Sequence, residues 1–226
     1  GIDKVSIRTG KFPLGPYPPL GFVTIYDAEL GNGDYFGLYW PLGKENEEPV
    51  ICDMIHDEWS LEPCFSSLTK FIEWLDLNDW ERGEEEVNDD EFAPSLFNKA
   101  KLLVSGPDFS EAVPLLRKAC IGFPEVSDYW FSLFSQLRRL KEMEEAANAL
   151  ISSYNANWVF GPPSEAVLRG LKDKRVKEYL QDDPVVQRID EIDLCFGGVK
   201  QNPTYNVMYE CVREYFKREK YLEGLK

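Results

Sequence analysis

Histidine is almost absent from this sequence of 226 residues, and the cysteines follow no metal-binding or disulfide spacing. The single His56 cannot build a multi-histidine metal site or a relay between two histidines. The five cysteines are odd in number and contain no Cys-x-x-Cys pair, which is typical of reduced thiols inside a cell. No apolar run approaches the roughly 20 residues of a transmembrane helix. We expect a cytoplasmic protein without a metal, a cofactor or a membrane contact. The opening residue, Gly1, favours a processed N-terminus.

Basic residues are scarce in the first part of the chain. Residues 1–92 contain 6 Lys and Arg against 21 Asp and Glu, whereas residues 93–226 contain 19 of each. The formal net charge of −15 therefore arises entirely in the first 92 residues. Phosphate backbones repel such a chain, so we expect no nucleic-acid partner. A dense anionic surface instead speeds the encounter with a basic protein and competes with nucleic acid for its binding site.

The composition changes at the same place as the charge. Residues 1–80 are rich in Gly, Pro, Tyr and Trp, which indicates strands and turns, whereas residues 93–226 show the periodicity of successive helices. The polar and acidic residues 81–92 between them are typical of a solvated linker. The sequence thus predicts an α+β protein. A small antiparallel sheet with a covering helix is followed by an all-α domain of helical repeats.

The first part contains signals for one hairpin, one further strand and one helix. Four prolines within residues 11–20 predict an extended arm. The aromatic and β-branched runs 22–26 and 35–40 flank a Gly-Asn-Gly-Asp turn, which predicts a hairpin, and a third strand is expected at residues 49–55. A serine cap and an apolar stripe predict a helix over residues 66–75 that covers the sheet.

The second part repeats at a period of 34 residues. Leu103 corresponds to Leu137, Ala112 to Ala146, and Leu116 to Leu150, each pair at a position of helix contact. A further helix is expected from about residue 164 to residue 180. A final helix over residues 204–225 could cap the array, because its apolar residues lie on one face.

Two family resemblances follow from these residues. Residues 20–76 resemble the later half of the SMI1/KNR4 (SUKH) superfamily, which implies a protein-interaction module. Many members are bacterial immunity proteins that neutralise toxins, nucleases among them, and some belong to eukaryotic regulatory scaffolds. The helix and strands that normally open this domain are not visible before Phe22, so the domain is either abbreviated or preceded by a further segment. The residues that carry the resemblance are Gly31, Asn32, Gly33, Asp34, Tyr35, Phe36, Leu38, Pro49, Val50, His56, Asp57, Ser67, Leu68, Phe71 and Leu75.

Residues 93–160 resemble two divergent tetratricopeptide-type repeats. Arrays of this type bind protein segments in their concave face, so the resemblance implies binding in a helical groove. Phe134 stands where these repeats have a glycine. The residues that carry the resemblance are Ala112, Ala119, Pro124, Trp130, Leu133 and Ala146.

Two sets of residues are candidates for binding a protein partner. The first set surrounds a histidine at the end of a predicted strand, where carboxylates and an aromatic side chain could contact a basic toxin. It consists of Asp34, Asp53, His56, Asp57, Glu58 and Trp59. The second set would line the helical groove of a regulatory scaffold and consists of Tyr129, Trp130 and Leu133.

Other interpretations of the first set remain open. His56 could satisfy a turn while Trp59 packs against the helix. An enzyme would need His56 and two carboxylates grouped in a pocket, and neither a pocket nor a second positioned group is visible in the sequence. We therefore expect no catalytic residue and leave the oligomeric state open.

Overall fold

The computed structural model describes residues 20–26, 34–55, 57–58, 60–106, 108–193 and 202–226. The expected proline-rich arm, apart from Leu20, and most of the Gly-Asn-Gly-Asp turn lie outside the described residues. So do two candidate binding residues, His56 and Trp59.

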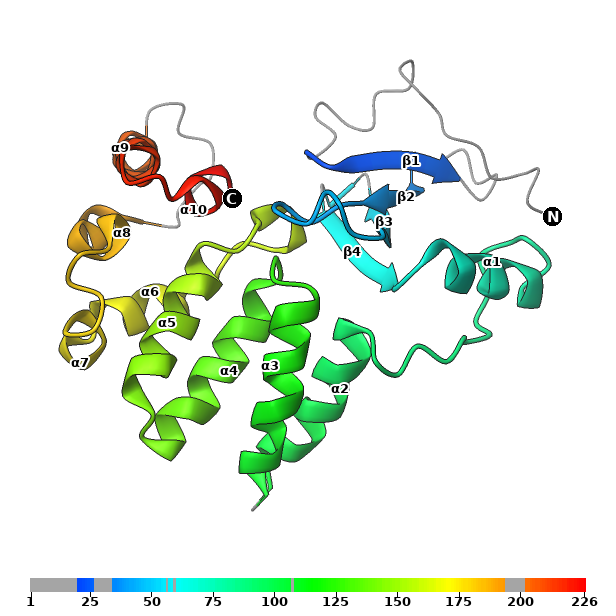
Figure 1. Cartoon of the computed structure of the whole chain (residues 1–226), viewed down its shortest axis with the longest axis horizontal. Helices are drawn as coiled ribbons and strands as arrows, with labels where there is room; N and C mark the ends of the chain where they lie inside the picture. The colour runs from blue at the N-terminus through cyan, green and yellow to red at the C-terminus, as the bar shows by residue number, and fades with distance from the viewer. Residues whose placement is uncertain (1–19, 27–33, 56, 59, 107, 194–201) are drawn as a thin grey trace.

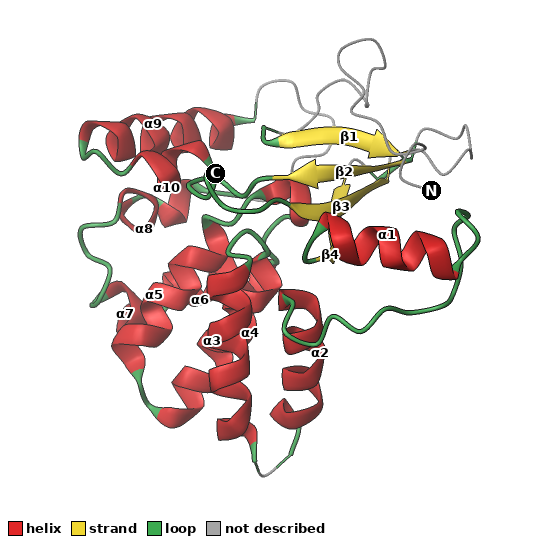
Figure 2. Ribbon diagram, turned by 45° about the vertical axis from the view of Figure 1, so that its right-hand side comes forward, coloured by secondary structure: helices red, strands yellow, loops and turns green. Residues whose placement is uncertain are grey.

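The described part of the chain begins with an antiparallel sheet of four strands in the order β1-β2-β3-β4 (Figure 2). The strands are β1 (Phe22–Tyr26), β2 (Tyr35–Tyr39), β3 (Val50–Ile55) and β4 (Ser60–Phe65). The expected hairpin strands and third strand are present. The fourth strand was not predicted, because Pro63 within it is a poor strand former. Its place at the sheet edge tolerates a residue that cannot donate to a neighbouring strand.

One face of the sheet is covered by α1 (Leu68–Leu77), as the sequence predicts. The Oγ of Ser67 accepts a hydrogen bond from the backbone N–H of Lys70 at 3.3 Å and caps the first turn. Phe71, Trp74 and Leu75 of the helix are buried against the sheet. They form a small core with Ile25, Tyr26, Phe36 and Ile51.

In the described part of the chain, α-helices and short 3₁₀ helices follow α1 (Figure 1). They are α2 (Ala93–Val104), η2 (Phe109–Glu111), α3 (Ala112–Gly122), α4 (Ser127–Leu140), α5 (Met143–Tyr154), η3 (Trp158–Phe160), α6 (Glu165–Lys172), α7 (Lys174–Lys177), α8 (Pro184–Gln187) and η4 (Ile189–Glu191). The last two are α9 (Pro203–Lys217) and α10 (Tyr221–Leu225). The sheet followed by helices confirms the predicted α+β class.

The positions repeated every 34 residues fall on packed helices. Ala112, Leu116, Ala146 and Leu150 are completely buried, and they lie at matching places in α3 and α5. The single helices expected over residues 164–180 and 204–225 are each divided. Asp173 ends α6 and caps α7 through its side chain. Glu219, whose φ of 60° lies in the left-handed region, separates α9 from α10.

The second face of the sheet packs against the helices. One buried hydrophobic cluster joins the sheet to the buried side chains of α2 to α9. The sheet contributes Tyr39, Cys52, Met54 and Leu61 to it. The ring of Tyr39 contacts Phe160 at a centroid distance of 5.0 Å. The sheet therefore lies between α1 and the helical array, and its described strands share a core with the helices.

A buried polar network fixes this junction. Glu125, which is 0% exposed, accepts hydrogen bonds from the Tyr39 hydroxyl and, at 2.8 Å, from the backbone N–H of Leu42. Asn157 donates to the Tyr39 hydroxyl at 3.1 Å. Burial raises the pKa of Tyr39 above its ordinary value, and the neighbouring Glu125 raises this pKa further. We call Tyr39, Leu42, Glu125 and Asn157 the junction network.

Candidate binding surfaces

The acidic segment between α1 and α2, residues 81–92, lies on the surface and is attached to the protein body. We call it the acidic strap. Near its start, Arg82 pairs with Asp53 at 2.6 Å. Near its end, Asp89 accepts hydrogen bonds from the backbone N–H and the hydroxyl of Ser66, both at 2.8 Å. The strap ends at Phe92, which is buried in the main core.

The middle of the acidic strap is held by one asparagine. The side chain of Asn78 donates to the backbone carbonyl of Glu85 and accepts from its backbone N–H, both at 3.1 Å. Gly83 passes so close that an added Cβ would lie 1.8 Å from the Asn78 oxygen, so only glycine fits there without displacement. Val87 packs onto the core beneath α1. The expected solvated linker is thus exposed, as predicted, but attached at several points.

The strap and α1 together present a surface dominated by carboxylates. The exposed acidic side chains are Glu73, Asp76, Asp79, Glu81, Glu84, Glu85, Glu86, Asp90 and Glu91. Three of them make ion pairs: Glu73 with Lys70, Asp90 with Lys99, and Glu91 with Lys118. The carboxylates of residues 84–86 lie at the centre of the run and make no ion pair with any described residue. We call residues 73–91 the acidic surface.

Two of the predicted binding carboxylates lie beside the acidic surface and not upon it. Asp53 is only 6% exposed, and burial raises the pKa of its carboxyl group although Arg82 opposes this shift. Asp34 lies close enough to affect the pKa of both Asp53 and Arg82. In the described conformation Asp53 is buried and pairs with Arg82, so a contact between Asp53 and a partner stays a prediction. Asp57 and Glu58 are exposed in the turn between β3 and β4, as a contact residue must be.

The predicted groove residues separate in the structure. Tyr129 and Leu133 are 5% and 3% exposed, so they are core residues and cannot line an open groove. Tyr129 instead packs against Phe97 at 4.6 Å between ring centroids. Trp130 is half-buried, donates to the carbonyl of Pro124 at 2.8 Å and lines a large cleft.

This cleft has a volume of about 800 Å³ and lies among α5, the segment before α8 and the C-terminal residues. Charges of both signs line it. The cationic side chains are Arg218, Lys220 and Lys226, and the anionic side chains are Glu178, Asp182, Asp183 and Glu223. Sequence periodicity could not find it, because its walls come from helices that are distant in the chain.

Asp183 is the most constrained carboxylate of this cleft. It caps α8 through the backbone N–H groups of Val185 and Val186, and it accepts from the Tyr215 hydroxyl at 2.9 Å. Asn155 in turn donates to the Tyr215 hydroxyl at 3.1 Å. Burial raises the pKa of Asp183 above its ordinary value, while these hydrogen bonds oppose the shift. All of these groups serve to hold α5, α8 and α9 together.

The described ranges contain no group of three or more His, Cys, Asp and Glu side chains that could hold a metal ion. Within the same ranges, no helix has the length and apolar character needed to cross a membrane.

These features define an α+β protein in which a small sheet packs between one helix and a helical array and an acidic strap crosses the surface. The family model of the YfbP N-terminal domain matches residues 8–84, ending inside the acidic strap. YfbP of Escherichia coli (strain K12) is 45% identical over 215 residues, which cover 93% of this chain and 76% of the relative. The chain therefore belongs to the YfbP family. No solved structure matches it.

Proposed function

We propose that this protein is a non-catalytic interaction module that binds a basic protein through the acidic surface. The observation that supports the proposal is the attachment of the acidic strap. Glu84, Glu85 and Glu86 are exposed, while the backbone beneath them is held by Asn78 and by the ends of the strap. A surface that is already ordered loses little conformational entropy when it binds.

The partner that this chemistry selects carries a cluster of Lys and Arg. Carboxylates in such density accelerate association and exclude acidic partners. The resemblance to SMI1/KNR4 proteins suggests a toxin, for instance a nuclease whose basic substrate site the acidic surface would cover. Membership in that superfamily and the identity of the toxin are parts of the proposal.

Affinity capture from a lysate of the source organism tests the proposal. The baits are the wild-type protein, a strap variant with Glu84→Lys, Glu85→Lys and Glu86→Lys, and a control with Glu111→Lys, Glu144→Lys and Glu165→Lys. All six substituted residues are exposed, so both variants change the net charge equally. We expect a basic protein on the wild-type and control baits at low salt, and its loss from the strap variant. Equal recovery on all three baits would contradict the proposal.

The cleft supports a second candidate function, the binding of a protein segment by the helical array. Trp130 offers an aromatic contact there, and charged side chains of both signs surround it. Ser152→Arg on α5 would obstruct the cleft without touching the acidic surface. Loss of a partner with this variant, but not with the strap variant, would favour the second candidate.

A further inference from the structure

The cleft beside α5, with its volume of about 800 Å³, has the size of a small-molecule site, since such sites usually measure roughly 300–1,000 Å³. Two aromatic side chains, Trp130 and Tyr179, line it together with Ile151 and Leu180. Tyr179 is 50% exposed, so its ring is accessible to a bound molecule. The cleft therefore offers apolar contact as well as charge.

Some charged groups of the cleft already have partners within the protein. Arg218 donates to the carboxylate of Glu214 at 2.9 Å and to the backbone carbonyl of Asp182. Asp183 accepts from the Tyr215 hydroxyl and from two backbone N–H groups of α8. These contacts hold the helices together, so the remaining charges of the cleft define its ligand.

The remaining charges come from two segments of the chain. Glu178 and Asp182 offer two carboxylates from the segment between α7 and α8. Lys220 and Lys226 offer two ammonium groups from the segment that follows α9, where Glu223 is the one carboxylate that lines the cleft. None of these five side chains makes a hydrogen bond or an ion pair with another residue that the structure describes.

Lys226 is the most shielded of the two ammonium groups, because its side chain is half-buried whereas Lys220 is exposed. Burial lowers the pKa of Lys226, while the negative charges of Glu125 and Glu223 oppose this shift without forming an ion pair. A partly desolvated cation without a close counterion costs free energy, and the carboxylate of a ligand would reduce this cost.

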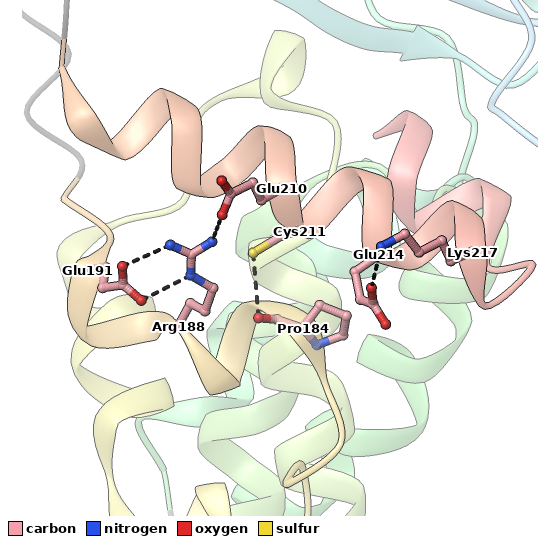
Figure 3. Close-up of polar contacts among 7 residues, drawn as sticks. All are labelled: Pro184, Arg188, Glu191, Glu210, Cys211, Glu214 and Lys217. Atoms are coloured by element: carbon pink, nitrogen blue, oxygen red, sulfur yellow. Dashed lines mark hydrogen bonds and ion pairs between the residues drawn. The ribbon is translucent and has the colours of Figure 1, made fainter.

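The two charged segments are held in place by contacts between α8 and α9. Arg188, next to α8, pairs with Glu191 and with Glu210 of α9 (Figure 3). The Sγ of Cys211 donates to the Pro184 carbonyl at 3.4 Å and joins the same two helices. Because α8 follows one charged segment directly and α9 precedes the other, these contacts preorganise the cleft, which favours binding.

We propose that the cleft binds a short free peptide through the charges at its two ends. The α-carboxylate of the peptide pairs with Lys226 and Lys220. Its α-ammonium group pairs with Glu178 and Asp182, and its apolar side chains contact the ring of Trp130. A ligand with a charge of one sign would leave one of the two sets without a counterion. The proposal goes beyond the second candidate function, because an internal protein segment has no charged ends, and it does not depend on the acidic surface.

Titration calorimetry with the tripeptide alanyl-phenylalanyl-alanine tests the proposal. The peptide is used in three forms: with free ends, with an acetylated N-terminus, and with an amidated C-terminus. We expect the free peptide to bind the wild-type protein. Blocking either end should weaken binding about tenfold, the value of one hydrogen bond to a charged group.

Matched substitutions locate each end of the peptide. Lys226→Met keeps the apolar stem and removes the charge, so it should weaken binding of the free peptide about tenfold and leave binding of the amidated peptide unchanged. Glu178→Gln combined with Asp182→Asn should weaken binding of the free peptide and leave binding of the acetylated peptide unchanged. Lys174→Met is the control, because Lys174 is exposed on α7 and does not line the cleft.

Three results would each overturn the proposal: no binding of the free peptide to the wild-type protein at millimolar concentration, equal affinity for the three peptides, or unchanged affinity for the free peptide in Lys226→Met. Equal affinity for the three peptides would leave the second candidate function standing. The strap variant should bind the free peptide as tightly as wild type does, because the peptide has no net charge. Failure of the basic-partner proposal is therefore distinguishable from failure of this one.

Discussion

Removing the carboxyl group of Glu125 should destabilise the whole protein and not the sheet alone. In Glu125→Ala the backbone N–H of Leu42 and the hydroxyl of Tyr39 lose their buried acceptor. Each unsatisfied buried donor costs about 1–3 kcal/mol, so we expect a loss of about 4 kcal/mol in the free energy of unfolding. Glu125→Gln retains an oxygen for Leu42 and should lose only about 1 kcal/mol.

Guanidinium chloride unfolding followed by far-ultraviolet circular dichroism measures both variants. Because the sheet and the helices share one buried cluster, the wild-type protein should unfold in a single transition. Glu125→Ala should lower its midpoint without changing the slope. A Glu125→Ala variant within about 1 kcal/mol of wild type would refute the importance of the junction network, and two separate wild-type transitions would refute the shared core.

Three further predictions concern Gly83 of the strap, Asp183 of the cleft and the buried Tyr154. Gly83→Ala should displace Asn78 and release the acidic strap, so limited proteolysis should cut the strap faster while the circular dichroism spectrum stays unchanged. Burial raises the pKa of Asp183 in the folded state, so the folded protein holds its proton more tightly than the unfolded chain and this group destabilises the fold as pH rises. Asp183→Asn, which retains a capping side chain, should therefore gain stability relative to wild type as the pH rises from about 4, the ordinary pKa of an aspartate, and a constant difference would contradict this. Tyr154→Phe removes an unsatisfied hydroxyl and should raise the melting temperature or leave it unchanged, whereas a clear drop would show that the hydroxyl has a partner.

The elements with strong local signals could be predicted from the sequence. The hairpin strands and the Ser67-capped helix α1 depend on side-chain alternation and capping, which are local properties. The alternation of side chains did not predict β4, because Pro63 is atypical of a strand and β4 tolerates it only at the edge of the sheet. It did not show the divisions of the two expected long helices either; the turn at Glu219 brings the ring of Phe216 against that of Tyr221, a contact that exists only once the chain has turned.

The candidate sites were predicted less well, because they depend on contacts between distant residues. The sequence identified the acidic run but not its attachment through Arg82, Asn78 and Asp89. Periodicity placed Tyr129 and Leu133 on a helix face without showing that neighbouring helices cover that face. The sequence could not show that the Tyr154 hydroxyl lacks a hydrogen-bond partner, since a buried tyrosine with a partner has the same apolar neighbours along a helix.

The salt dependence of partner affinity tests the central claim most directly. The dissociation constant of the captured basic protein is measured for the wild-type, strap and control proteins from about 0.05 M to about 0.5 M salt, a range over which exposed charges become screened. We predict that wild type and control weaken steeply with salt, and that the strap variant binds weakly with a much shallower dependence. Identical salt dependence of the wild-type and strap proteins would contradict binding through the acidic surface.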